Sequence, residues 1–186
     1  MTATQVILGV GGVCGVLALL CSVAGIHINI TSSLPRGVYR VVARPDTDSD
    51  TRALARGMIV LACLPMQPAV LGRERGYLGR GNCPGHAMFI GKRVVAHSGD
   101  TVVTSELGVR VNGRWIPESR ALERDRRGRS LVHAPFGVHV LGTGDVFLMG
   151  DGPWSWDSRY VGVLPTSSVR AVVRPLWVGA VPLASS

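Results

Sequence analysis

The chain has one lysine, Lys92, beside 19 arginines, and this lysine lies within the apolar stretch 87–96. Arginine stays protonated at working pH, whereas lysine serves as a general base once its pKa falls. In a strand, Lys92 shares a face with Ile90 and Val94, and burial against such neighbours lowers the pKa of an amine. The pattern favours a neutral lysine base over the alternative, a lysine that reaches water from a strand edge.

A lysine base needs a nucleophile, and the stretch 31–40, "TSSLPRGVYR", offers a serine on constrained backbone. Pro35 fixes its own φ angle close to Ser33, and Gly37 permits a tight bend. Ser33 also lies only five residues past the long apolar run, where it would meet substrates anchored in a membrane. Taken alone, the stretch is more typical of a turn that follows a helix.

A third polar segment, "MGDGPWSWDSRYVG" at 149–162, gathers Asp, Ser and Arg in one turn with Gly and Pro. Ser155 is placed to hydrogen-bond a lysine amine, and Asp157 to pair with Arg159 and hold the turn. A solvated loop is the alternative interpretation of this segment on its own.

Taken in order, these segments resemble a known set. "KRVVAHSGD" (92–100) resembles the lysine box of type I signal peptidases, and "GDGPWSWDSRYVG" (150–162) resembles their Gly-Asp…Ser-x-Asp-Ser-Arg box. "SLPRGVYR" and "YLGRGNCPGH" are similar to the TraF-type maturation peptidases of conjugative plasmid transfer, whose nucleophile lies in Ser-x-Pro-x-Gly-x-Tyr. The resemblance runs from about residue 29 to about residue 175.

This resemblance implies a Ser/Lys dyad peptidase that uses no cofactor and no metal. Ser33 would be the nucleophile and Lys92 the general base, with the Thr31 hydroxyl beside the Ser33 N–H in the oxyanion hole. Ser32 is the minor alternative nucleophile, because Pro35 follows it by three residues, as in general signal peptidases.

The resemblance also assigns supporting roles and a substrate class. Ser155 would orient the lysine, while Asp157 and Arg159 would shape the site. The implied activity is endoproteolysis of a membrane-anchored, pilin-like or exported precursor at a small side chain, with no nucleic acid required. Some relatives also join the new pilin ends into a ring, which this sequence does not decide.

Two other functions stay open from the sequence. One is a general type I signal peptidase that cleaves many exported preproteins. The other is a non-catalytic, membrane-tethered transfer component that binds DNA or a partner through the Arg-rich loop 120–129. The formal charge of +8 suits an anionic partner, although solvated arginines are its simpler explanation.

The elements that would position these residues begin with a membrane anchor over residues 1–28. The run 6–28 is apolar or small apart from Ser22 and His27, and as a helix it spans about 34 Å. A cleaved signal peptide is the alternative, since "SVA" at 22–24 resembles a cleavage site. The resemblance implies a single-pass inner-membrane protein whose catalytic domain faces the periplasm. The arginines that follow the run oppose this orientation: Arg36, Arg40 and Arg44.

Residues 29–186 are predicted to form one mainly β, antiparallel domain of the signal peptidase type. Short β-like runs recur at 37–44, 57–64, 87–96, 108–116, 144–150 and 169–181. Asn112-Gly113 marks a hairpin with a two-residue turn. The stretch 65–86 contains many Pro and Gly residues and is predicted to be irregular, and no second helix is expected.

The cysteines and histidines show no metal-binding pattern. There is no CxxC motif, no HExxH motif and no Cys/His cluster with zinc spacing. In an exported domain, a disulfide between Cys63 and Cys83 would close a loop of about 20 residues and contribute roughly 3 kcal/mol. Two unrelated thiols are the alternative from sequence alone.

Overall fold

The computed structural model describes residues 25–45 and 54–179. Most of the predicted anchor, residues 1–24, therefore lies outside the described residues. The described part of the chain has no helix that is long and apolar enough to cross a bilayer. The predicted helix is wrong at its end, because Ile26–Asn29 forms strand β1, whose backbone pairs antiparallel with the next strand.

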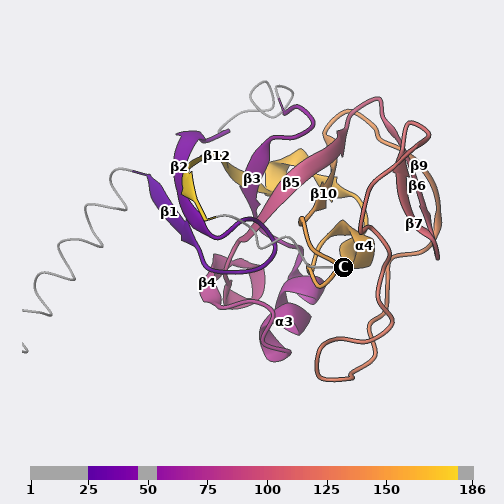
Figure 1. The fold of residues 1–186 in the computed structure, drawn as a ribbon, viewed down its shortest axis with the longest axis horizontal. Helices are drawn as coiled ribbons and strands as arrows, with labels where there is room; N and C mark the ends of the chain where they lie inside the picture. Colours follow the sequence, from indigo (N-terminus) through magenta and orange to yellow (C-terminus); the bar gives the residue numbers. More distant parts are fainter. Residues whose placement is uncertain (1–24, 46–53, 180–186) are drawn as a thin grey trace, which may run out of the picture.

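A seven-stranded antiparallel sheet carries the site, as the sequence patterns predict (Figure 1). Its order is β1-β2-β12-β3-β5-β10-β11, so strands from both ends of the chain lie side by side near one edge. After β1 the strands are β2 (Gly37–Ala43), β3 (Ile59–Ala62), β5 (Ile90–His97), β10 (Asp145–Met149), β11 (Leu164–Pro165) and β12 (Val169–Val178).

Strand β5 lies inside this sheet, between β3 and β10, and its residues alternate between buried and half-buried. Ile90, Lys92 and Val94 share the buried face, as strand alternation predicts. Ile90 and Val94 pack with Val60 in an apolar cluster, and Val60 is the register partner of Lys92. The lysine is thus inserted into the face of the sheet that carries the main core.

A second, four-stranded sheet has the order β8-β7-β6-β9 and packs beside β10 through a smaller apolar cluster. Its strands are β6 (Thr101–Ser105), β7 (Gly108–Val111), β8 (Arg114–Trp115) and β9 (Gly137–Val140). The predicted hairpin is confirmed, because Asn112 and Gly113 link β7 to β8 with φ angles of 48° and 81°. A two-residue turn with both φ angles positive matches the twist of the flanking strands.

The stretch predicted to be irregular contains the helix α3 (Met66–Glu74), so the expectation of no second helix is wrong. A strand β4 (Arg80–Cys83) and a 3-10 turn η1 (Pro84–His86) follow it. Near the site lies the short helix α4 (Ser158–Val161), and the turn η2 (Thr166–Ser168) precedes β12.

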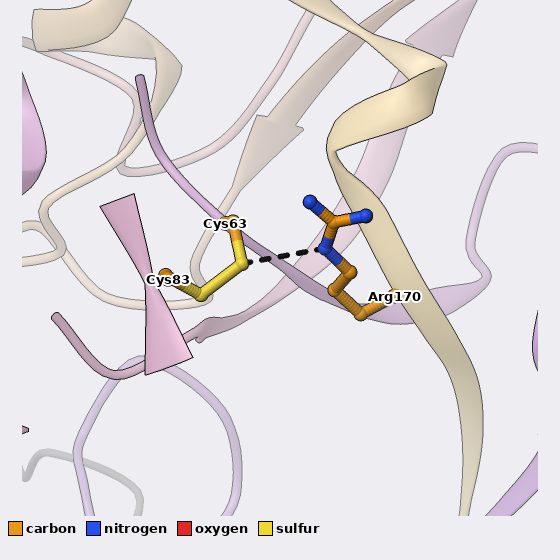
Figure 2. Close-up of a disulfide and its surroundings, with 3 residues drawn as sticks. All are labelled: Cys63, Cys83 and Arg170. Carbon is orange, nitrogen blue, oxygen red and sulfur yellow. Dashed lines mark hydrogen bonds between the residues drawn. A yellow bond between two sulfur atoms is a disulfide. The ribbon is translucent and has the colours of Figure 1, made fainter. Parts of the chain in front are cut away.

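A disulfide joins Cys63, directly after β3, to Cys83 at the end of β4, which confirms the predicted pairing. The two Cα atoms are 5.3 Å apart. The Nε of Arg170 on β12 lies 3.5 Å from the Cys63 sulfur (Figure 2). The bond encloses α3 in a covalent loop, so the segment after this helix is tied to the residue that directly follows β3.

Candidate active site

One cavity of about 680 Å³ brings together residues that are far apart in the sequence. Ser33 follows β1, Lys92 lies on β5, and Ser155 precedes α4, yet all three line this cavity. Thr31 and Ser32 line it as well, whereas Asp157 and Arg159 are buried and do not line it. Its volume is within the range of pockets that enclose small ligands or short peptide segments.

The turn that carries Ser33 is held by one buried side chain, Asn29. The Asn29 amide N–H groups donate to the carbonyls of Leu34 at 2.9 Å, Pro35 at 3.1 Å and Thr31 at 3.2 Å. Its Oδ1 accepts the Thr31 N–H at 3.2 Å and the Thr31 hydroxyl at 2.8 Å. A single amide thus fixes both sides of the turn, a role that sequence reasoning missed.

The Ser33 turn is joined to the turn that follows β10. The N–H of Asp151 donates to the Ser33 carbonyl at 2.8 Å. A Cβ atom on Gly150 would lie 2.8 Å from that carbonyl oxygen and 2.7 Å from the Ser155 Cβ. Only a residue without a side chain therefore allows Ser33 and Ser155 to approach this closely. The Ser155 Oγ is buried and has no hydrogen-bond partner among the described residues.

Lys92 is 3% exposed, and its environment favours the neutral amine. Burial lowers the pKa of Lys92 from its ordinary 10.5 to about 8; the charge of Asp157 opposes the fall and that of Arg159 adds to it. The burial predicted from strand alternation is confirmed, and a lysine that reaches water from a strand edge is excluded. An appreciable neutral fraction near pH 8 gives this amine the capacity to accept a proton.

Asp157 and Arg159 form a buried ion pair, with an Arg159 guanidinium N–H 2.9 Å from Asp157 Oδ2. Asp157 also accepts the Gly150 N–H at 2.9 Å. The Arg159 guanidinium donates to the carbonyls of Glu118 and Arg120 at 3.2 and 3.3 Å, about 40 residues earlier in the chain. The predicted pairing is confirmed, and it ties the Ser155 turn to a distant segment.

Comparisons with known proteins identify the family of the chain. The family model described as signal peptidase, peptidase S26, matches residues 2–177. The chain belongs to this peptidase family. A plasmid transfer protein TraF of Escherichia coli is 37% identical over 169 residues, which cover 89% of this chain and 90% of that protein.

Other relatives carry related names. A probable conjugal transfer protein TraF of Sinorhizobium fredii is 37% identical, covering 81% of this chain and 76% of the relative. The crystal structure of a signal peptidase I from Enterococcus faecalis V583 is 18% identical and covers 64% of this chain and 95% of its own. Its TM-score is 0.35, too low for any comparison of the two sites.

Within this S26 family member, Thr31 does not stand ready as an oxyanion donor. A hydroxyl has one proton, and that of Thr31 is donated to Asn29. Thr31 would have to rotate away from Asn29 before it could stabilise an oxyanion beside the Ser33 N–H. The signal for this arrangement is the Asn-x-Thr spacing, which places both side chains within one turn.

The Arg-rich loop of this family member is less solvated than its composition suggests. Arg124 and Arg126 are exposed, as predicted for a surface loop, but Asp125 between them is buried. Asp125 accepts the Tyr77 hydroxyl at 2.5 Å and the Arg129 Nε at 2.6 Å. Part of the loop, including Arg126, Arg127 and Arg129, lines the same cavity as Ser33.

Proposed function

We propose that the chain is a serine endopeptidase in which Ser33 is the nucleophile and Lys92 the general base. The observation that carries this proposal is the shared cavity of Ser33 and a buried Lys92 whose pKa falls to about 8. A buried lysine costs stability unless its neutral form is used, since a pKa lowered from 10.5 to about 8 disfavours the ammonium by about 3 kcal/mol.

In this mechanism, neutral Lys92 accepts the Ser33 hydroxyl proton while the serine oxygen attacks the scissile carbonyl. The tetrahedral oxyanion accepts the Ser33 N–H and, after Thr31 rotates, the Thr31 hydroxyl. The Lys92 ammonium then gives its proton to the leaving amine, which leaves an acyl-enzyme on Ser33. Water attacks the ester with Lys92 again as base, which releases the acid and restores both residues.

Ser155 is proposed to orient the Lys92 amine. Its Oγ is buried on the cavity wall and has no partner in the described part of the chain. A hydroxyl in that state has both a donor and an acceptor to offer to an amine that gains and loses a proton.

The proposed substrate is a membrane-anchored, pilin-like precursor processed at a small side chain for conjugative DNA transfer. The names of the relatives, plasmid and conjugal transfer proteins, favour this substrate over the broad set of a general signal peptidase. We further propose that the apolar run 6–28 anchors the chain in the inner membrane and that the catalytic domain faces the periplasm. The Cys63–Cys83 disulfide supports exposure to an oxidising compartment.

The test is cleavage of a quenched fluorescent peptide with small residues on both sides of the scissile bond. Ser33→Ala and Lys92→Arg should each reduce kcat/KM by at least about 10³-fold, because nucleophile and base act as one unit. Ser32→Ala is the matched control and should retain activity. Cleavage that survives both Ser33→Ala and Lys92→Arg would refute the dyad, and loss only in Ser32→Ala would move the nucleophile to Ser32.

The pH profile tests the role of Lys92 separately. A base acts only when neutral, so kcat/KM should rise about tenfold per pH unit below the pKa of Lys92 and level off above about pH 8. A profile that is flat between pH 6 and 9 would exclude Lys92 as the group that accepts the proton.

A further inference from the structure

The cavity that contains Ser33 and Lys92 has an uneven charge. Its wall carries one acidic residue, Asp125, among the described residues, but several basic ones. The basic residues besides Lys92 come from the end of α3 and from the Arg-rich loop: Arg75, Arg126, Arg127 and Arg129. Hydrolysis through Ser33 and Lys92 uses none of these four arginines, so their gathering at the cavity calls for another explanation.

The one carboxylate is already occupied within the protein. Besides the Tyr77 hydroxyl and the Arg129 Nε, Asp125 accepts the N–H groups of Arg127 at 2.8 Å and Arg129 at 3.0 Å. Burial acts to raise the pKa of Asp125, but these hydrogen bonds outweigh it and bring the pKa below its ordinary value. Ionised Asp125 therefore neutralises Arg129 and fixes the turn between them.

Arg126 and Arg127 form the tip of this fixed turn. Both side chains are exposed, and no acidic side chain of the described residues forms an ion pair with either of them. The Arg126 guanidinium lies over the Trp154 ring, 5.3 Å from its centre, which favours one orientation of the arginine. Trp154 is 47% exposed and directly precedes Ser155, so the held guanidinium lies beside the turn that carries the proposed lysine partner.

We propose that Arg126 and Arg127 form a subsite for an acidic side chain of the precursor segment that enters the cavity, which rests on the proposed peptidase function. Guanidinium groups bind carboxylates through two parallel hydrogen bonds, and a partly enclosed site screens the attraction less than open solvent does. A cavity of about 680 Å³ that also contains Ser33 suits a short extended peptide and has no room for a nucleic-acid duplex.

The test uses the full chain in detergent micelles and quenched decapeptides rich in Ala and Gly. One Glu is moved through the positions of the peptide, and each peptide is matched with one that carries Gln instead. At one or two neighbouring positions, Glu should raise kcat/KM by about 5- to 10-fold over Gln, and added salt should reduce this ratio. Arg126→Gln/Arg127→Gln should bring the ratio to about 1.

The matched control is Arg114→Gln/Arg174→Gln, which removes two exposed positive charges at positions that do not line the cavity. The control should keep the ratio of Glu to Gln. A ratio of about 1 at every position in the parent protein overturns the subsite, even if all peptides are cleaved. An equal loss of the ratio in the control also overturns it, because net charge alone would then explain the preference.

Two further measurements separate this subsite from the proposed function and from lipid binding. In fluorescence anisotropy, the Ser33→Ala protein should bind the favoured Glu peptide more tightly than the matching Gln peptide. If this preference is found but the parent protein cleaves no peptide, the proposed peptidase function is refuted and the subsite is supported. Phosphatidylglycerol vesicles test whether the two arginines bind an anionic lipid headgroup instead. If Arg126→Gln/Arg127→Gln weakens vesicle binding and leaves the Glu preference unchanged, the arginines bind a headgroup and the proposal fails.

Discussion

The two segments that meet at the cavity wall are held in different ways. The Ser33 turn depends on a neutral side chain, Asn29, whose partners all lie within six residues. The Ser155 turn depends on the buried ion pair of Asp157 and Arg159, and the arginine reaches carbonyls about 40 residues away. One segment is therefore organised locally, and the other is fastened to the rest of the fold.

This difference predicts different consequences of substitution. A network of neutral hydrogen bonds can be broken without leaving a buried charge, whereas removal of one ion-pair partner leaves the other charge without compensation. The Ser155 turn, which the ion pair holds, fixes the position of the proposed partner of Lys92. The Ser33 turn, which Asn29 holds, leaves Thr31 free to rotate and change its hydrogen-bond partner. Changes in the Ser155 turn should mainly reduce stability, and changes around Asn29 should mainly reduce activity.

The largest expected effect comes from Asp157→Asn. This variant leaves the Arg159 guanidinium buried without its counter-ion, so the free energy of unfolding should fall by about 3–5 kcal/mol. Urea unfolding at pH 7 followed by tryptophan fluorescence measures this loss. Activity per folded molecule should fall less, because the amide oxygen introduced at position 157 can still accept the Gly150 N–H.

A double-mutant cycle shows whether the ion pair is responsible. Arg159→Met alone should also be strongly destabilising, and Asp157→Asn/Arg159→Met should cost less than the sum of the two single variants. Additive losses would mean that the carbonyl contacts of Arg159, and not its charge, hold the turn.

The second effect lies at the contact between the two segments. In Gly150→Ala, the new methyl group would clash with the Ser155 side chain and press on the Ser33 carbonyl. Stability should fall by about 1–3 kcal/mol, and kcat should fall by about 10²-fold because Ser33 is displaced. Gly179→Ala is the matched control for activity, since its backbone does not need a positive φ, a Cβ there meets only the Arg36 carbonyl at 3.8 Å, and it does not line the cavity. Unchanged kcat in Gly150→Ala would show that the approach of the two turns is not needed.

The third effect concerns the local network. Asn29→Ala removes five hydrogen bonds from the Ser33 turn; the bond to the Leu34 carbonyl is buried, and the other four are only partly buried. We expect kcat/KM to fall by about 10- to 100-fold and the free energy of unfolding by only about 1–2 kcal/mol. Asn29→Asp keeps the two contacts to Thr31 and should retain more activity. A stability loss as large as that of Asp157→Asn would remove the contrast between the segments.

The sequence predicted what alternation and short spacings determine. The face of Lys92 follows from the period of two in β5, and the pairing of Asp157 with Arg159 follows from their proximity in one turn. The hairpin at Asn112 and Gly113 follows from the backbone angles that such a turn requires. The disulfide needed one additional assumption, export to an oxidising compartment.

Other features depend on tertiary contacts that no local pattern reveals. Helix α3 contains Pro68 and Gly72 and has no side-chain cap, so its intrinsic signals are weak; packing of Ala69 and Gly72 against the core stabilises it. Gly150 is required because Ser33 and Ser155, which are far apart in the sequence, both approach it. Asp125 accepts a hydrogen bond from Tyr77, which follows α3 and is 48 residues away in the sequence. The same limit applies to Ser33 and Lys92, which the fold alone brings to one cavity.

The smallest expected effect tests the surface link between the two segments. Arg93 donates two parallel hydrogen bonds to the Asp151 carboxylate at 3.0 and 2.9 Å, and the Asp151 N–H holds the Ser33 carbonyl. Both side chains are about one-third exposed, so Arg93→Gln should cost less than about 1 kcal/mol. Activity should fall by only about 2- to 5-fold, through a looser Ser33 turn, and Arg93→Lys should fall in between because it keeps the charge but loses the paired geometry. A loss of several kcal/mol in Arg93→Gln would mean that the Arg93–Asp151 pair fastens the Ser33 turn to the whole fold, as the Asp157–Arg159 pair does for the Ser155 turn. The Ser33 turn would then not be locally organised.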